Sequence, residues 1–223
     1  MSIHRTKAAL VLFLLIMFAA TTLSLVNTKS HEPRNLALCK QEVKEYVTSE
    51  QYMEDISKVT SEAEQYIGEH LDSSRQNAIV LDIDETSLSH LQYELSLDLG
   101  YSVSTYREWI KKAQASPILP TLLLYKWVKS KNLAVFFITG ITEDLRAPLT
   151  VNLTQAGYVR WDSLYMRPEN SHEPASVYKS RVRKEITERG YYIIANIGDQ
   201  ESDFAGGYAE KALKLPNPMY MVK

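Results

Sequence analysis

The stretch NAIVLDIDET, residues 77–86, decides the fold. Its apolar first half, residues 77–81, is typical of a short strand that is buried on both faces. Two carboxylates follow at the carboxyl end of this strand, which is where open α/β sheets place their chemistry. Because side chains alternate along a strand, Asp82 and Asp84 point to the same side and Ile83 points away. The sequence therefore predicts a pair of acidic groups at one edge of a buried sheet.

Two carboxylates so close together repel each other unless a cation or a shared proton lies between them. A divalent metal is the simplest remedy, and oxygen ligands favour Mg²⁺. A D-x-D pair is also found where a strand simply runs into an acidic turn. The rest of the chain has to decide between these two interpretations.

Length and composition indicate one globular domain with appendages. The chain has 223 residues, with 25 Lys and Arg against 27 Asp and Glu. This near-neutral balance gives no support for a protein that binds a nucleic acid polymer, which is usually basic. Cys39 is the single cysteine, so neither an intramolecular disulfide nor a cysteine-based zinc site can form.

The amino terminus has a basic start and a long apolar run, unlike the rest of the chain. Arg5 and Lys7 lead into an uncharged apolar run over residues 8–26. We interpret residues 1–26 as a signal peptide, or as a membrane anchor if the run is retained, since it is long enough to span a bilayer. Either alternative predicts an exported protein, periplasmic or secreted, that touches a membrane only through residues 8–26. The polar residues 27–35 are predicted to form a linker.

Hydrophobic periodicity predicts an α/β fold with a central parallel sheet, because strands alternate with helices. The predicted strands are residues 77–82, 134–138, 164–166 and 192–196. The predicted helices between them are residues 120–131, 143–155 and 176–189. Helical segments at about 36–72 and 88–118 are expected to form a small appendage to the sheet.

Three local signals refine the helix predictions. Thr48 followed by Gln51 resembles a capping box, which predicts that two helices meet near Thr48. Thr105 followed by Glu108 predicts another helix start. Pro148 lies within the helix predicted over 143–155 and predicts a kink there.

Several predicted strands end in polar residues that suit one common site. Thr139 and Gly140 end the second strand, while Asp199 follows the last strand, with Asp203 one helical turn later. Lys179 lies near the start of the helix between these strands. Each of these residues alone has an ordinary structural explanation. Their order and their places at strand ends together predict a single site.

Four motifs carry a family resemblance. DIDET at 82–86, FFITG at 136–140, YKSRVR at 178–183 and NIGDQESDF at 196–204 resemble the four motifs of the haloacid dehalogenase superfamily. More narrowly, they resemble subfamily IIIB, which holds bacterial class C acid phosphatases, plant acid phosphatases and vegetative storage proteins. The resemblance runs from about residue 36 to the end. It implies a Rossmannoid three-layer phosphatase domain over residues 36–223.

The resemblance also implies catalytic roles that the chemistry of the residues supports. Asp82 would be the nucleophile that forms an aspartyl phosphate. Asp84 would protonate the leaving oxygen and then act as the base that activates water. Mg²⁺ would be the cofactor, held by the Asp82 carboxylate, the backbone carbonyl of Asp84 and the carboxylate of Asp199.

The remaining motif residues would bind phosphate or support the site. Thr139, the amide of Gly140 and Lys179 would bind the phosphoryl oxygens whose charge grows in the transition state. Asp203 would orient Lys179 or a water on the metal, and Thr86 would brace the loop after the first strand.

This sequence departs from the family pattern at one position. Ile141 stands where the family often has an arginine after the Thr-Gly pair. Arg146 is a candidate to compensate for that arginine. Two histidines, His90 and His172, lie near the motifs, and we expect both to be surface or loop residues.

Substrate recognition is the least determined part of the function. No large cap domain fits between the motifs, so the site should admit varied small phosphomonoesters. Tyr93, Tyr101, Tyr106 and Trp109 either line the entrance and stack on a base or aryl group, or belong to the core of the helical appendage. The sequence does not determine the oligomeric state.

Two alternative functions remain open at this point. Vegetative storage proteins share the fold, so a non-catalytic storage or binding protein is one alternative. A phosphotransferase side activity, in which an alcohol replaces water as the acceptor, is the other.

Overall fold

The computed structural model describes residues 32–222 of the chain, which divides into two compact units, residues 1–39 and residues 40–223. Helix α2, Leu36–Val47, begins in the described part of the first unit. The signal peptide or anchor predicted at residues 1–26, and most of the predicted linker, lie outside the described residues. Within those residues, no helix is both long enough and apolar enough to cross a membrane.

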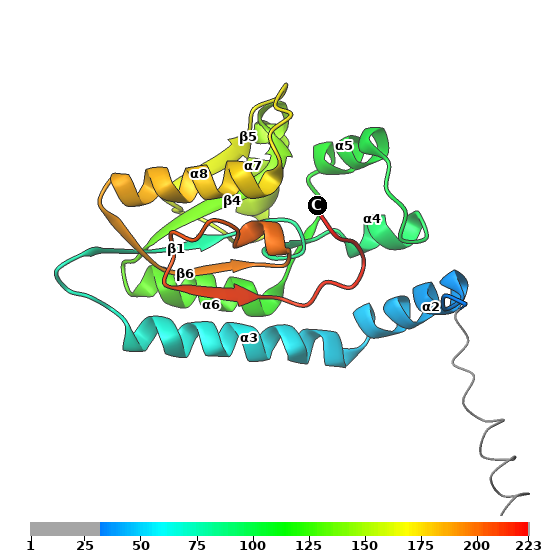
Figure 1. Ribbon diagram of the computed structural model, residues 1–223, viewed down its shortest axis with the longest axis horizontal. Coiled ribbons are helices and arrows are strands. Elements are labelled where there is room, and N and C mark those ends of the chain that lie inside the picture. Colours follow the sequence, from blue (N-terminus) through cyan, green and yellow to red (C-terminus); the bar gives the residue numbers. More distant parts are fainter. Residues whose placement is uncertain (1–31, 223) are drawn as a thin grey trace, which may run out of the picture. The chain divides into compact units, whose positions relative to one another are not determined.

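A five-stranded parallel sheet in the order β5-β4-β1-β6-β7 forms the centre of the second unit (Figure 1). The strands are β1 Gln76–Leu81, β4 Ala134–Thr142, β5 Ser163–Arg167, β6 Tyr191–Gly198 and β7 Lys211–Lys214. This confirms the predicted α/β fold with a central parallel sheet. The sequence analysis did not predict β7, because only Leu213 in it is buried and no apolar run marks it.

A small insertion after β1 contains a second, two-stranded antiparallel sheet of β2 and β3. Its strands are β2 Leu88–Ser89 and β3 Ser116–Pro117, and its helices are α4 Leu91–Ser96 and α5 Val103–Lys111. The remaining helices are α3 Glu50–Glu69, α6 Leu119–Ser130, α7 Arg146–Gln155 and α8 Ala175–Glu188. All the predicted helices after the first strand are present, with ends that differ from the predictions by a few residues.

Both predicted helix starts lie close to observed ones, but neither has the side-chain cap that the sequence suggested. Helix α3 begins just beyond Thr48, as expected, but Thr48 and Gln51 form no capping box. The Thr48 hydroxyl instead donates to the carbonyl of Lys44 in the last turn of α2, which is a common local alternative for threonine. Helix α5 begins two residues before Thr105, because its first turn follows the extended Ser102.

The helix predicted over 143–155 is divided in two. A 3-10 turn, η1 Glu143–Leu145, precedes α7, which starts at Arg146. Pro148 therefore lies in the first turn of α7, where a backbone N–H would have no intrahelical partner. The proline is thus accommodated in the first turn of a helix that begins later than predicted.

Side-chain alternation along β1 separates two helical layers. Ile79 and Leu81 face one core cluster and Ala78 and Val80 face the other. The first cluster contains residues of α3 and α6, namely Ile56, Ala63, Ile67, Leu122, Leu124, Tyr125 and Val128. The second contains residues of α8, namely Tyr178, Val182 and Ile186. Figure 1 shows α8 on one side of the sheet and α6 and α3 on the other.

This arrangement confirms the three-layer fold. It also gives α3 a different place from the one expected of it, because α3 covers the sheet beside α6 instead of belonging to an appendage. By the same alternation, Asp82 points to the face of the sheet that α8 covers, as Val80 does. The fold thus brings α8 and the end of β1 together.

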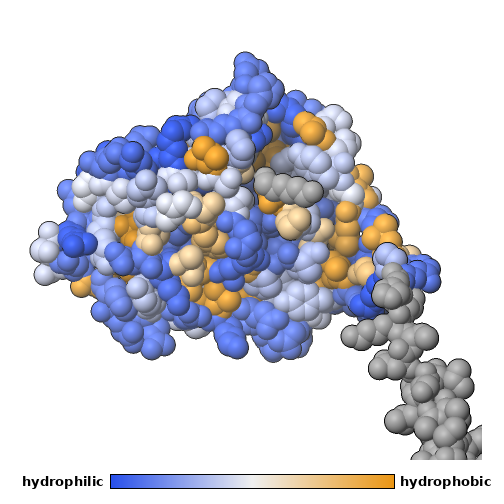
Figure 2. All heavy atoms as spheres, in the orientation of Figure 1, coloured by the Kyte–Doolittle hydropathy of each residue, from blue (hydrophilic) through white to orange (hydrophobic). Residues whose placement is uncertain are grey.

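The surface seen in Figure 2 is hydrophilic over most of its area, with hydrophobic residues in small separate groups. Scattered apolar residues of this kind are ordinary on a protein surface and need no partner to explain them. The features that call for an explanation lie at the carboxyl ends of the strands.

Candidate active site

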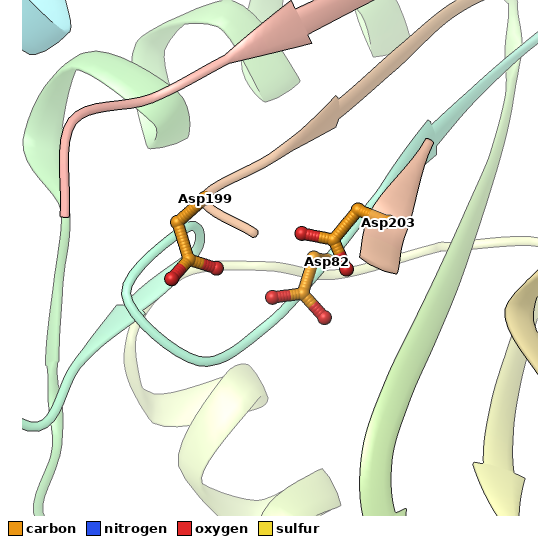
Figure 3. Close-up of side chains that lie close together, drawn as sticks. All are labelled: Asp82, Asp199 and Asp203. Carbon is orange, nitrogen blue, oxygen red and sulfur yellow. The ribbon is translucent and has the colours of Figure 1, made fainter. Parts of the chain in front are cut away.

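Three buried carboxylates converge at the carboxyl ends of β1 and β6. Asp82 follows β1, Asp199 follows β6, and Asp203 ends the short 3-10 helix η2, Glu201–Asp203. Each contributes a carboxylate oxygen, and these oxygens lie within 4.8 Å of one another. Figure 3 shows the three side chains pointing toward one another. The predicted convergence of acidic groups from the first strand and from β6 is therefore present.

Lys179 of α8 reaches into this cluster. Its Nζ donates to Oδ1 of Asp82 and to Oδ1 of Asp203, and all three side chains are buried. Burial alone would lower the pKa of Lys179, but the two carboxylates raise it. Burial raises the pKa of Asp82 while Lys179 opposes that rise. The lysine is thus a permanent cation against the first carboxylate of the DIDET motif.

Asp203 uses both of its carboxylate oxygens. Oδ1 accepts from Lys179, and Oδ2 accepts from the backbone N–H of Gln200 at 2.8 Å. The side chain lies directly against Gly198, where a Cβ atom would stand 2.3 Å from Oδ2. Only glycine leaves room for this approach. Both oxygens are thus committed to protein donors, as expected of a residue that orients Lys179.

Asp199 is held by three side chains. Its Oδ2 accepts from Nε2 of Gln200 at 2.6 Å and from Nδ2 of Asn217 at 2.7 Å. Its Oδ1 lies 3.3 Å from the hydroxyl of Thr86, which is also 3.5 Å from Oδ2 of Asp82. Burial and the neighbouring Asp203 raise the pKa of Asp199, and the amide donors oppose this. Thr86 therefore links the two carboxylates, in keeping with the bracing role predicted for it.

The donor set fits a hard divalent cation. The groups that converge are all carboxylate oxygens, which are the ligands such cations prefer. Burial raises the pKa values of Asp82 and Asp199, and the neighbouring carboxylates raise them further, so a bound cation would favour the ionised forms of both groups. The side chain of Asp84 is not part of this cluster, so that residue is a candidate ligand only through its backbone carbonyl.

Asp84 lies in a distinct environment beside the cluster. Its Oδ1 accepts from the hydroxyl of Tyr106 and lies 2.8 Å from Nε2 of His90. Its Oδ2 accepts from the hydroxyl of Thr139 at 2.9 Å. Although burial would raise the pKa of Asp84, these three neighbours lower it to about 2. The two acids of DIDET therefore have opposite pKa shifts.

His90 is not the surface or loop residue that the sequence suggested. Its side chain is 1% exposed, and its Nδ1 accepts a hydrogen bond from Nε1 of Trp109 at 2.8 Å. A polar residue just before a short helix is usually exposed, and here the packing of α5 buries it. His172, in contrast, is exposed as expected.

A cavity of about 550 Å³ opens beside the carboxylates. Its walls include Asp82, Asp84, Gly140, Lys179 and Asp199. Tyr101 and Tyr106 also line it, whereas Tyr93 and Trp109 are buried in the hydrophobic core and are absent from its walls. Of the four aromatic residues proposed to stack on substrate, the geometry thus leaves Tyr101 and Tyr106 as candidates.

The predicted phosphate-binding residues lie at the end of β4. Gly140 lines the cavity, and the neighbouring Thr139 is fully buried. The Thr139 hydroxyl accepts from the backbone N–H of Ile141 at 3.0 Å and donates to Asp84. In this structure the hydroxyl therefore positions Asp84, and its contact with phosphate remains a prediction.

Arg146 does not take the place of the missing family arginine. Its guanidinium pairs with Glu143 and donates to the carbonyl of Leu164 at 3.0 Å. Ile141 is 6% exposed and packs in the hydrophobic core. The substitution thus replaces a polar contact by apolar packing.

The sequence analysis missed two groups of site residues. Glu85 is buried with a backbone φ of 50°, and its Oε2 accepts from the Tyr220 hydroxyl at 2.6 Å. Burial raises the pKa of Glu85 to about 7. Asn217 and Gln200 hold Asp199 as described above. Asn217 and Tyr220 come from the tail that follows β7, where no strand or helix pattern marks them.

Comparison with known proteins agrees with the geometry. The model of the haloacid dehalogenase superfamily, subfamily IIIB (acid phosphatase), matches residues 17–223. The chain is 34% identical to acid phosphatase 1 of Solanum lycopersicum over 190 residues, which cover 82% of this chain and 74% of that protein. It is 33% identical to vegetative storage protein 1 of Arabidopsis thaliana over 192 residues, 83% of this chain and 71% of that protein.

The fold likewise has a solved counterpart. The class C acid phosphatase from Bacillus anthracis superimposes with a TM-score of 0.68 at 20% sequence identity, covering 83% of this chain and 87% of that one. Three of the motifs lie at the carboxyl ends of β1, β4 and β6, and the motif at 178–183 lies in α8, from which Lys179 reaches the carboxylates. The chain belongs to the acid phosphatase subfamily, IIIB, of the haloacid dehalogenase superfamily.

Proposed function

We propose that this protein is an exported, Mg²⁺-dependent acid phosphatase that hydrolyses small phosphate monoesters through an aspartyl phosphate on Asp82. One observation carries the proposal. A buried carboxylate, Asp82, lies against the ammonium of Lys179, and a second carboxylate, Asp84, is held separately in the same cavity. A nucleophile and an acid–base group two residues apart at one strand end are what a two-step phosphoryl transfer requires.

In the first step, a carboxylate oxygen of Asp82 attacks phosphorus and the ester P–O bond breaks. Asp84 gives its proton to the departing oxygen. Lys179 lies within hydrogen-bond distance of Asp82, so its charge also acts on the phosphoryl oxygens that approach there. Gly140 lines the cavity, and its amide would donate to the same group.

In the second step, Asp84 takes a proton from water, which attacks the aspartyl phosphate and regenerates Asp82. The low pKa of Asp84, about 2, keeps it ionised and available as a base in acidic solution. A bound phosphate monoester adds negative charge beside Asp84 and increases its affinity for a proton. This supplies the protonated form that the first step uses.

The cofactor proposed is Mg²⁺, held by the carboxylates of Asp82 and Asp199 and the backbone carbonyl of Asp84. When bound, such a cation neutralises charge on the phosphoryl group and on the crowded carboxylates. Asp203 acts by holding Lys179 in place. Thr86 keeps Asp82 and Asp199 together.

The cavity supports a small-molecule substrate with a planar group. Its volume of about 550 Å³ suits a ligand of nucleotide size or smaller. Tyr101 is 67% exposed and lines the cavity together with Tyr106, so these two residues would contact an aryl group or a base of the substrate. A nucleic acid polymer is not proposed as substrate.

Export rests on the amino-terminal sequence, through a cleaved signal peptide or an anchor at residues 8–26. A measurement of the mature amino terminus after secretion distinguishes these two forms. A first residue beyond position 26 indicates cleavage, and an intact Met1 indicates an anchor.

Turnover of 4-nitrophenyl phosphate tests the catalytic proposal directly. Asp82→Asn should remove activity while the variant remains folded, and a chelator should remove the activity of the wild type until Mg²⁺ is restored. Full activity of Asp82→Asn would reject the mechanism. Restoration by a different divalent cation but not by Mg²⁺ would reject the choice of metal.

A storage or binding function is the second candidate, because one similar protein is named a vegetative storage protein. The retention of Asp82 and the full carboxylate cluster favours catalysis. Absence of metal-dependent turnover on a panel of nucleoside, sugar and aryl phosphates would favour storage instead. Product analysis with added glycerol would reveal a phosphotransferase side activity as glycerol phosphate.

A further inference from the structure

His90 presents an unusual buried nitrogen to the proposed acid–base residue. Its Nε2 lies 2.8 Å from Oδ1 of Asp84. Nε2 has no other hydrogen-bond partner among the described residues. Because a buried polar nitrogen needs a partner, Oδ1 of Asp84 is the atom that this nitrogen serves.

Trp109 fixes which nitrogen of His90 carries the proton. Its indole N–H can only donate, and it points at Nδ1 of His90 at 2.8 Å. Nδ1 is therefore the acceptor, and the ring proton belongs on Nε2, which faces Asp84. Trp109 is 7% exposed and packs in the core, so the orientation of the imidazole is set by a rigid neighbour.

The donors around Asp84 are distributed unequally over its two oxygens. Tyr106 and His90 both approach Oδ1, while Thr139 alone donates to Oδ2. A carboxylate oxygen has two lone pairs, so Oδ1 has none to spare and Oδ2 has one. A proton carried by Asp84 therefore belongs on Oδ2.

We propose that His90 is a positioning residue that, with Tyr106, occupies Oδ1 of Asp84 and so places the transferable proton on Oδ2. This inference rests on the proposed function, in which Asp84 protonates the leaving oxygen. As the ester P–O bond breaks, its electron pair stays on the leaving oxygen, which takes the proton from Oδ2. Asp84 becomes a carboxylate, and Asp82 gains the bond to phosphorus.

The dependence of rate on the leaving group isolates this role. An alkyl alcohol leaves poorly without a proton, whereas 4-nitrophenolate leaves readily as an anion, so a misplaced proton slows alkyl esters more. The parameter to compare is kcat/KM, which covers the steps up to cleavage of the ester. A purely structural defect would lower kcat/KM for both esters by the same factor.

The closing experiment measures kcat/KM for an alkyl and an aryl phosphate in the full, Mg²⁺-loaded chain. His90→Leu should lower the alkyl value about 10–100-fold and the aryl value by less than about 3-fold. His90→Gln, whose amide N–H can reach Asp84, should recover most of the alkyl rate. His172→Leu is the matched control at an exposed position, and it should behave as the wild type.

Trp109→Phe tests the same role of His90 if His90→Leu does not fold. It keeps an aromatic ring in the core but removes the donor that orients the imidazole, so it should also slow the alkyl ester selectively. Equal losses on both esters, or no loss, in the folded variants would overturn the role of His90. If Asp84→Asn leaves the leaving-group dependence unchanged, the proposed acid–base assignment fails, and the inference fails with it.

Discussion

Replacing Gly198 by alanine should disable the site by displacing one carboxylate. An alanine Cβ at this position would stand 2.3 Å from Oδ2 and 2.6 Å from Cγ of Asp203. Ordinary contact begins at 3.4 Å, so the carboxylate must move by about 1 Å, the difference between 3.4 and 2.3 Å. Gly198 does not have a positive φ, so alanine adds no backbone strain and the effect is steric alone.

That displacement has two measurable consequences. Asp203 would lose its contacts with Lys179 and Gln200. Overpacking and the loss of a buried hydrogen bond to a charged group should together lower the free energy of unfolding by on the order of 3 kcal/mol. For a chain of this size the melting temperature should fall by about 6–12 °C. A misplacement of about 1 Å at a reacting centre should lower kcat roughly 100-fold.

Thermal unfolding and 4-nitrophenyl phosphate turnover would measure these effects, with Gly68→Ala as the matched control. Gly68 lies inside α3, and the nearest atoms to its added Cβ are those of Trp127 at 3.9 and 4.0 Å. This control should keep full activity and gain about 0.5–1 kcal/mol from better helix propensity. If Gly198→Ala kept the wild-type melting temperature and kcat, the close approach of Asp203 would be wrong.

Three further predictions concern stability. Glu85 has its pKa raised from 4.5 to about 7 in the folded protein, so its contribution to stability is complete below pH 4.5 and is lost as the pH rises through 7. In urea titrations of the metal-free proteins, the free energy of unfolding of the wild type relative to Glu85→Gln should therefore fall by about 3 kcal/mol between pH 4.5 and 7. A difference between the two proteins that does not change with pH would contradict the raised pKa. Ile56→Ala removes a fully buried side chain between α3 and the sheet, which should cost about 2–5 kcal/mol while kcat of the folded fraction is unchanged. The Arg183 guanidinium donates to three backbone carbonyls of residues 203–207. Arg183→Met should therefore lower the free energy of unfolding by at least about 3 kcal/mol, and Arg183→Lys should not restore the lost stability. Full stability of Arg183→Lys would show that charge alone suffices.

The parts of the fold and site that could be predicted from the sequence depend on local rules. The four residues before Asp82, Ala78 to Leu81, are all apolar and buried, so the segment is recognisable as a buried strand without any knowledge of its neighbours. Period-two alternation then fixes the side to which Asp82 points, and the rule for strand ends brings Asp199 to the same edge. The observed cluster of carboxylates follows from these two rules and the parallel order of the strands.

The residues that were missed owe their positions to tertiary packing. Asn217 reaches Asp199 from a tail with no regular structure, and Tyr220 reaches Glu85 across 135 positions of sequence. No periodicity encodes such contacts. Strand β7 was missed for a related reason, because an edge strand needs only one buried side chain, Leu213, to pack on the sheet.

The four aromatic residues also show that the sequence does not separate core residues from residues that line the cavity. Tyr93, Tyr101, Tyr106 and Trp109 lie in one segment and look alike as sequence. In the structure Tyr93 and Trp109 are core residues, while Tyr101 and Tyr106 line the cavity. Within α5, Trp109 is buried in the core and Tyr106 lines the cavity, while Tyr93 belongs to α4 and Tyr101 precedes α5. The choice between core and binding wall depends on how α5 docks, which the segment alone does not encode.

The two acids of DIDET give the strongest physical reason to expect a cation in the site. A nucleophile must be ionised, yet burial among carboxylates raises the pKa of Asp82. The donors around Asp84 lower its pKa instead, which by itself would favour Asp84 as the ionised group. Lys179 opposes the rise in the pKa of Asp82, and its ammonium also pairs with Asp203. A cation bound among Asp82, Asp199 and Asp203 would add positive charge beside the nucleophile and favour its ionised form, and converging carboxylate oxygens are suited to binding such a cation.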